Sequence, residues 1–313
     1  MRDSFDVAVG SKLFHVYVLA AVLHGSELAI IDLHSLRTYE KCLRGWGRRL
    51  LGWPRGSPNA AVLGDLGWDD FEALALGRVA GLFARLRCRP WAGVRSEIFV
   101  VVFQYALTRN DSWASWAAAS LGAAGVPDHN VWGVGPGAPI AAGQRWRRRA
   151  AVSALSVSSQ QRFTAASAEI DSLAFYASLQ PAPLLHLSVH NRRVQAADAR
   201  EWGLARCGHH SFCDGRIARH QTYHSQCLLC DCDDGTLEHA LNRCPATEDV
   251  RSTWRRRVGA GSGYSDGFAA MAWMFDPGSL HNSGPTCVAH VALVSVVSRR
   301  GALVFRELRA LNA

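Results

Sequence analysis

The sequence predicts a mainly α-helical protein, and three observations support this fold class. Apolar residues recur at helical spacing in the first hundred residues, and glycines and prolines separate short segments. A chain of 313 residues with 49% hydrophobic content can also bury one or two cores. We expect a helical bundle over 1–120, a Gly/Pro-rich linker over 121–143 and a helical domain over 144–313 that holds most of the cysteines.

The first strong element is an amphipathic helix after Ser35, whose side chain can cap the N-terminus of the helix. Its apolar residues follow a 3-4-3-4 spacing, at Leu36, Tyr39, Leu43, Trp46 and Leu50. Gly52 and Pro54 end the run. The pattern predicts a helix that buries this stripe and has a basic outer face.

Two more helices are expected directly afterwards. Ser57 and Pro58 have the order of an N-cap and a first helical residue, and Gly67 can close the short helix that they open. Asp69 or Asp70 can then cap a longer helix. The apolar residues of that helix are Phe71, Leu74, Leu82 and Leu86. Short connections between these helices favour a compact bundle.

The linker is predicted from its composition. Residues 122–143 contain six glycines and three prolines, which a regular helix or strand does not tolerate. Helical periodicity returns over 144–179, and further helical signals lie near 247–259, 266–275 and 286–311. The second helical domain therefore surrounds the cysteine-rich segment.

The cysteine-rich segment has the spacing of a zinc site, C-x2-C-x8-H-x4-C. Its candidate ligands are Cys227, Cys230, His239 and Cys244. A C-x2-C pair places two thiolates on one tight turn, and a short return segment supplies the histidine and the last cysteine. Asp233, Asp234 and Gly235 form a natural reversing turn, and Thr236 can cap a helix that carries the histidine. We expect one structural Zn²⁺ in a CCHC knuckle.

Two alternatives stay open around this site. Cys232 competes with Cys230 as the second ligand. A looser group upstream contains Cys207, His209, His210 and Cys213. It could hold a second metal, but so short a segment wraps one ion with difficulty.

The DCDD sequence at 231–234 also resembles the paired-aspartate turn of a nucleotidyl-transfer palm, but its context argues against that interpretation. A palm needs apolar strands on both sides and a further aspartate on a neighbouring strand, and zinc-spaced cysteines flank DCDD instead. Neither lysine, Lys12 or Lys41, has an acid two residues before it, as a D/E-x-K nuclease would require. We therefore expect no catalytic residue. A zinc hydrolase would need an open coordination position, and Glu238 is its only local candidate base.

The net charge indicates a partner of negative charge, and the N-terminal segment indicates an intracellular protein. The net charge is +8, which suits the phosphates of nucleic acid, although only two of the 34 basic residues are lysines. The first apolar run is too short to span a bilayer and has no signal-peptide exit, so we expect a nuclear or cytoplasmic protein with no membrane partner and no small-molecule substrate. The candidate phosphate-binding residues are Arg44, Arg48, Arg49, Arg147, Arg148, Arg149, Arg251, Arg255, Arg256 and Arg257. The alternative for each is a solvated helix face, and Arg147–Arg149 could equally be a nuclear-import patch.

The order of three sequence segments along the chain is informative. An apolar helix ending in HGSE precedes an Arg-rich helix and the phrase LLGWPRGSPNAAVLGDLGW; REWGLARCG follows, and then the motif CLLCDCDDGTLEHALNRCP. In this order they resemble the thumb, the spacer and the cysteine-histidine motif that follow the palm in reverse transcriptases of non-LTR retrotransposons. The resemblance covers about residues 15–90 and 195–255. Two positions depart from the family: His24 replaces a tyrosine, and Gly235 replaces the glutamate before Thr236.

The resemblance implies a C-terminal fragment that binds template RNA or target DNA and lacks the palm and fingers with their catalytic aspartates. The missing polymerase core would be a further partner. Two alternatives from other classes remain: a zinc-stabilised helical module for protein interaction, marked by an exposed apolar patch, and a retroelement relic without activity.

Overall fold

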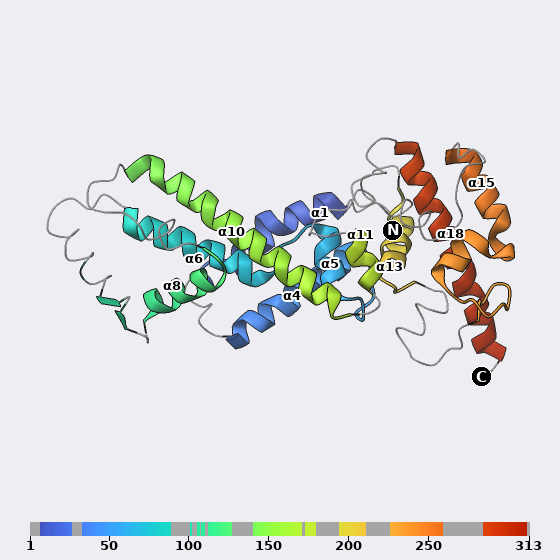
Figure 1. Ribbon diagram of the computed structural model, residues 1–313, viewed down its shortest axis with the longest axis horizontal. Coiled ribbons are helices and arrows are strands. Elements are labelled where there is room, and N and C mark those ends of the chain that lie inside the picture. Colours follow the sequence, from blue (N-terminus) through green and yellow to red (C-terminus); the bar gives the residue numbers. More distant parts are fainter. Residues whose placement is uncertain are drawn as a thin grey trace. The chain divides into compact units, whose positions relative to one another are not determined.

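The computed structural model of the protein is mainly helical (Figure 1). It describes residues 7–26, 33–88, 101, 105–106, 108–109, 112–126, 140–170, 173–179, 194–210, 226–258 and 284–311. No strand occurs among these residues, which confirms the predicted mainly α class. Nor does any helix in the described ranges combine the length and the apolarity needed to cross a membrane.

The chain forms two compact units, each assembled from separated segments. Unit 1 comprises Met1–Lys12, Arg44–Trp68 and Phe163–Ala313, and unit 2 comprises Leu13–Leu43 and Asp69–Arg162. Neither unit begins or ends at the boundaries expected from composition, at 120 and 143. Packing and composition thus divide this chain differently.

Unit 2 contains η1, a π-helix at Phe14–Leu19, followed by α2 (Ala20–Val22), the first part of α4 (Leu33–Leu51), α6 (Phe71–Cys88), α8 (Trp113–Ala123) and most of α10 (Ile140–Ala168). Asp70 caps α6, because its Oδ1 accepts from the backbone N–H of Ala73 at 2.8 Å. This settles the choice between Asp69 and Asp70. Arg162 of α10 donates to both carboxylate oxygens of Asp70, at 2.7 and 2.9 Å, and so joins α10 to the start of α6.

The predicted linker at 121–143 is shorter than expected. Helix α8 continues to Ala123 and α10 already begins at Ile140, so both ends of the Gly/Pro-rich stretch are helical. Gly125 lies just after α8 with a φ of 76°, and the three prolines and the other glycines between the two helices lie outside the described residues. Ala141 and Ala142 favour helix and outweigh the single glycine that follows them.

Unit 1 contains the end of α4, α5 (Asn59–Leu66), α11 (Ala174–Leu179), α13 (Ala196–Arg206), α15 (Glu248–Val258) and α18 (Gly284–Leu311), together with residues 7–12 of α1 (Val7–Leu13). Two short turns, η3 (His239–Arg243, π-helical) and η4 (Pro245–Thr247, 3-10), precede α15. Expected helices at 247–259 and 286–311 correspond to α15 and α18. The expected helix at 266–275 lies outside the described residues.

Helix α4 ends where the sequence predicts, but its buried face differs in part from the predicted stripe. Gly52 ends it with a φ of 66°, whereas Trp46, expected inside, is 42% exposed. Leu43 of the predicted stripe is buried as expected, and Gly47 and Leu51, which the stripe did not include, are buried as well. A Cβ at Gly47 would lie 2.7 Å from Val62 of α5, so the absence of a side chain lets α5 approach closely and turns this face inward.

Helix α5 is buried along almost its whole length and carries one acid. Pro58 is its N-cap, one residue later than expected, and Gly67 closes it with a φ of 63°. Asp65 accepts from Arg206 Nη1 at 2.8 Å and from Tyr176 Oη at 2.9 Å. All three residues are at most 1% exposed, and the Arg206 guanidinium lies 5.0 Å from the Tyr176 ring centroid. A buried ion pair thus joins α5, α11 and α13.

A second core lies among α13, α15 and α18, which pack together (Figure 1). Trp202 of α13, Trp254 of α15 and three valines of α18, Val291, Val294 and Val297, are buried there. Leu237, Ala240 and Leu241, around η3, belong to the same core. This packing holds the cysteine-rich segment against three helices.

Candidate metal centre

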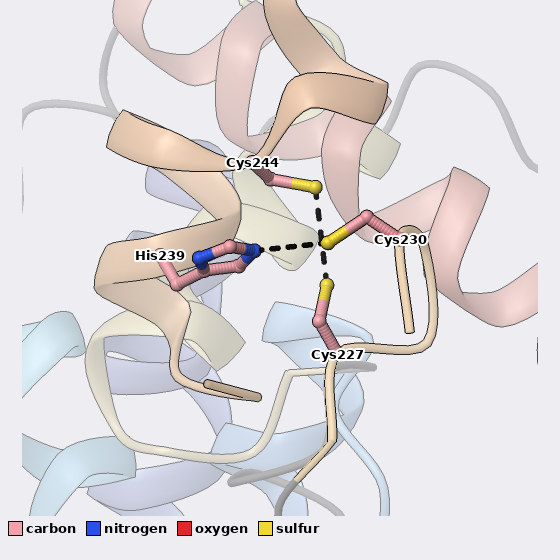
Figure 2. A group of neighbouring side chains, drawn as sticks. All are labelled: Cys227, Cys230, His239 and Cys244. Atoms are coloured by element: carbon pink, nitrogen blue, oxygen red, sulfur yellow. Dashed lines mark hydrogen bonds between the residues drawn. The ribbon is translucent and has the colours of Figure 1, made fainter. Parts of the chain in front are cut away.

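The four predicted ligands converge on one point. Figure 2 shows the side chains of Cys227, Cys230, His239 and Cys244 directed toward one another. One donor atom from each lies within 4.8 Å of all the others. The sulfurs of Cys227 and Cys244 are 3.9 Å apart, and Cys230 Sγ is 3.3 Å from His239 Nε2. This cluster could hold a metal ion, as the spacing predicts.

The first two cysteines lie on a tight turn. The N–H of Asp231 donates to Cys227 O at 2.9 Å, and the N–H of Cys227 donates to Cys232 O at 2.7 Å. Asp231 has a φ of 58°, the left-handed conformation that aspartate tolerates better than most residues. The turn therefore returns the chain on itself and brings both thiols to one side.

Backbone N–H groups are aimed at the ligand sulfurs. Burial raises the pKa of Cys227, and N–H donors from Leu229 and Cys230 pull that pKa back down. Burial likewise raises the pKa of Cys230 and of Cys244, opposed by the N–H groups of Cys232 and Ala246 respectively. Such donors stabilise the thiolate, which is the form that binds metal. The pKa of each of the three thiols stays raised by burial, and the backbone donors reduce that rise.

His239 is presented by a capped turn. Thr236 Oγ1 accepts from the N–H of His239 at 3.1 Å, so Thr236 caps this segment as expected. Asp234 accepts from both the N–H and the hydroxyl of Thr236, at 3.2 and 2.6 Å, and its Oδ2 faces His239 Nδ1 at 3.8 Å. Burial lowers the pKa of His239, partly offset by Asp234. The neutral imidazole favoured by this environment is the form that coordinates metal.

Asp234 thus has a structural part in the cap. The sequence DCDD is the turn of the metal segment, not the turn of a hairpin, and no strand occurs beside it in the described residues. Glu238, the one candidate base, accepts from Arg243 at 3.1 Å. Both acids therefore take part in local contacts of this segment.

Cys232 lies beside the four donors. Its sulfur is 3.4 Å from Cys230 Sγ and 3.3 Å from His239 Nε2. It also donates to Asp234 O at 3.7 Å, as a protonated thiol does. The N–H of Cys232, in turn, is aimed at Cys230 Sγ. Cys230 belongs to the group of four donors that lie within 4.8 Å of one another, and Cys232 lies directly beside that group.

The looser upstream group has the chemistry of a packed core. Cys207 is fully buried and donates to Leu204 O at 3.5 Å, and burial raises its pKa to about 12. That pKa disfavours the thiolate that a metal would require. His209 and His210 are also buried, while Cys213 lies outside the described residues.

The candidate phosphate-binding arginines differ in burial and in hydrogen-bond partners. Arg251 is 5% exposed and donates to Thr247 and Glu248, which gives it a structural role. Arg48 donates to Ser57 O at 2.9 Å and to Asn59 Oδ1, so it supports the start of α5. Exposed positions belong to Arg49, Arg149, Arg256 and Arg257, while Arg44 and Arg255 are partly buried. Arg147 and Arg148 lie in α10, and their side chains are outside the described residues.

Two site features have no counterpart in the sequence prediction. One is the Asp65–Arg206–Tyr176 cluster, and a lone acid within the apolar run of α5 is the signal that would have indicated it. The other is the exposed Trp46, which lies 5.5 Å from the Arg49 guanidinium.

Comparisons with protein-family models, with curated proteins and with solved structures give no match.

Proposed function

We propose that this chain binds nucleic acid through a helical domain stabilised by one structural Zn²⁺ ion. The observation that carries the proposal is the convergence of three thiols and one imidazole. In tetrahedral zinc, bonds of about 2.3 Å place two sulfurs about 3.8 Å apart. The 3.9 Å between Cys227 Sγ and Cys244 Sγ fits this geometry.

The donor set supports zinc and a structural role. Thiolate and imidazole are the ligands that zinc takes in closed sites, and four protein donors leave no position for a reactive water. Because Leu237, Ala240 and Leu241 are in the core with Trp202 and Trp254, metal binding would be coupled to folding of the surrounding helices. The proposed activity is accordingly binding rather than catalysis.

Cationic side chains next to this site support nucleic acid as the partner. Helix α15 begins four residues after the last ligand and ends in Arg255, Arg256 and Arg257. Arg256 and Arg257 are exposed, and Arg255 pairs with the half-exposed Glu248 at 3.1 Å. An exposed ion pair is worth little, so a phosphate can replace Glu248 at low cost. The net charge of +8 has the same sign.

The resemblance to the region after the palm in non-LTR retrotransposon reverse transcriptases narrows the partner to template RNA or target DNA. The phrases LLGWPRGSPNAAVLGDLGW and REWGLARCG and the metal segment belong to unit 1, whereas the apolar segment that ends in HGSE belongs to unit 2. A polymerase core carrying the catalytic aspartates would then be supplied by another polypeptide segment.

Fluorescence anisotropy tests the proposal with the zinc-loaded full chain, a labelled RNA hairpin and a labelled single-stranded DNA at several salt concentrations. Changing Arg255, Arg256 and Arg257 to glutamine should weaken binding and reduce the slope of log K against log salt by about 2 to 3. A matched triple variant at the exposed Arg37, Arg55 and Arg78 removes the same charge and should change the slope much less. Equal effects of the two variants would show that only net charge matters.

Metal dependence is measured in the same assay. Cys244→Ser should lose both the bound zinc, counted by mass spectrometry of the metal, and most of the affinity for nucleic acid. Zinc binding without any nucleic-acid binding would leave the metal as a structural element alone.

One observation favours a second function, a module for protein interaction. Leu13, Val16 and Tyr17 lie at helical spacing on one face and are 45%, 54% and 67% exposed. An exposed apolar stripe is typical of a protein-binding surface. If no nucleic acid binds, this function takes precedence.

A further inference from the structure

We propose that Cys230 and Cys232 are an oxidation site: hydrogen peroxide converts them to a disulfide, and this bond releases the metal ion. The inference rests on the proposed metal site and adds its regulation. Its starting observation is a fourth sulfur, that of Cys232, beside a set of three sulfurs and one imidazole that already supplies four donors.

The geometry favours this pair of thiols. Their sulfurs are 3.4 Å apart, closer than the 3.9 Å between Cys227 and Cys244. A disulfide of about 2.05 Å requires the two atoms to approach by about 1.4 Å, which rotation of two side chains can supply. Asp231, between them, has a φ of 58° and already places both thiols on one side of the turn.

Access to oxidant favours the same pair. Cys227 and Cys244 are 2% and 0% exposed, whereas Cys230 and Cys232 are both partly exposed. A small oxidant therefore meets the outer edge of the cluster first. Reaction at the inner two sulfurs would require the core around Leu241 and Trp254 to open.

The chemistry balances in two steps. The Cys230 thiolate attacks one oxygen of hydrogen peroxide and breaks the O–O bond, which gives a Cys230 sulfenic acid and hydroxide. The Cys232 sulfur then attacks the Cys230 sulfur, an S–S bond forms, and the leaving hydroxyl takes the Cys232 proton as water. Two electrons pass from the two sulfurs to the peroxide. One thiolate, one thiol and one peroxide become one disulfide, one water and one hydroxide.

The disulfide removes a ligand from the metal. Cys227, His239 and Cys244 remain, and they no longer close a tetrahedron. Because the metal segment belongs to the core of α13, α15 and α18, release would loosen the same surface that carries Arg255 to Arg257. Oxidation would then lower affinity for nucleic acid, and a thiol reductant with zinc would restore it.

The test exposes the zinc-loaded full chain to hydrogen peroxide and follows two readouts. A chromogenic chelator records zinc release, and mass spectrometry of the tryptic peptide 220–243 locates the disulfide by loss of two hydrogens. Cys232→Ser and Cys232→Ala should retain zinc before oxidation and release it about tenfold more slowly, since an adjacent thiol captures the sulfenic acid intramolecularly. Cys42→Ser, an exposed thiol on α4, is the matched control and should behave as wild type.

The outcomes separate this inference from the proposed function. Zinc bound before oxidation, with release at the wild-type rate in both Cys232 variants, refutes the oxidation site and leaves the metal site intact. Loss of zinc from both Cys232 variants before oxidation also refutes it, because Cys232 would then be a ligand. A wild-type chain that binds no zinc refutes both. Fragment ions that place the bond at Cys227 and Cys230 would assign the reaction to the wrong pair.

Discussion

Replacing Arg206 with methionine removes the cation from the most buried ion pair in the described residues. The Asp65 side chain is 2% exposed and that of Arg206 0%, so no bulk water can solvate the carboxylate left behind. Methionine retains the apolar contact with Tyr176 and Trp202, whose rings lie 5.0 and 5.2 Å from the guanidinium carbon. The variant therefore tests the charge more than the packing.

The expected loss of stability has a lower and an upper bound. Removing one partner of a buried pair typically costs about 3 to 5 kcal/mol. The Tyr176 hydroxyl still donates to Asp65 at 2.9 Å and offsets about 1 kcal/mol. The variant can also fold with Asp65 protonated. Protonating a carboxyl whose unfolded pKa is about 3.9 costs about 4 kcal/mol at pH 7, and this cost is the upper bound on the loss of stability. We expect a loss of about 3 to 4 kcal/mol.

The loss should depend on pH. Burial raises the pKa of Asp65 in the wild type, and Arg206 and Tyr176 oppose that rise. Without Arg206, the pKa of Asp65 in the folded state lies further above its unfolded value. The carboxyl then contributes stability below its unfolded pKa, and this contribution is lost as pH rises through its folded pKa. The difference between variant and wild type should therefore shrink from pH 7 to pH 5, by up to about 2.7 kcal/mol.

Urea-induced unfolding, followed by circular dichroism at both pH values, measures these free energies. The double variant Asp65→Leu/Arg206→Met removes both charges and should recover most of the stability, because a paired replacement leaves no buried charge alone. A loss below about 1 kcal/mol in Arg206→Met, with no pH dependence, would contradict the reasoning. Additive effects of the two substitutions would also contradict it.

Two further predictions follow from packing and from the metal. Gly64→Ala places a Cβ 2.2 Å from Tyr176 Oη and 2.8 Å from Phe163, so thermal denaturation should show a loss of folding stability of about 1 to 3 kcal/mol. The control is Gly81→Ala in α6, where nothing lies within 4 Å of the added Cβ, and this variant should be more stable by up to about 1 kcal/mol. Removal of metal with a chelator should increase hydrogen exchange in η3, η4 and α15 while α6 in unit 2 stays protected, and unchanged exchange over 237–258 would show that no metal supports this core.

The cluster of three thiols and one imidazole could be predicted from sequence because its geometry is local. Cys227 to Cys244 is one short segment, and a turn with a capped helix is enough to bring its donors together. Helix ends were predictable for the same reason: Gly52, Gly67 and Asp70 act within one turn of their own position.

Long-range contacts could not be predicted in this way. Periodicity placed Trp46 in the core, but the close approach of α5 at Gly47 turned a neighbouring face inward. Arg251 is a candidate phosphate-binding residue because of its charge and position. In the structure its guanidinium donates to the Thr247 hydroxyl within its own domain. The W-x-L-x-R phrase at 202–206 was matched as a resemblance, and its arginine proves to be the buried partner of Asp65.

The separation of 141 residues between Asp65 and Arg206 has a consequence for biosynthesis. While the ribosome is still making α10, the apolar surface of α5 and its carboxylate have already emerged without the tyrosine and the arginine that later cover them. Closing such a distant contact comes late and is slow, and exposed apolar segments on a nascent chain are targets for aggregation. Production of this protein should therefore respond to slower translation or to added chaperone more strongly than its modest size suggests.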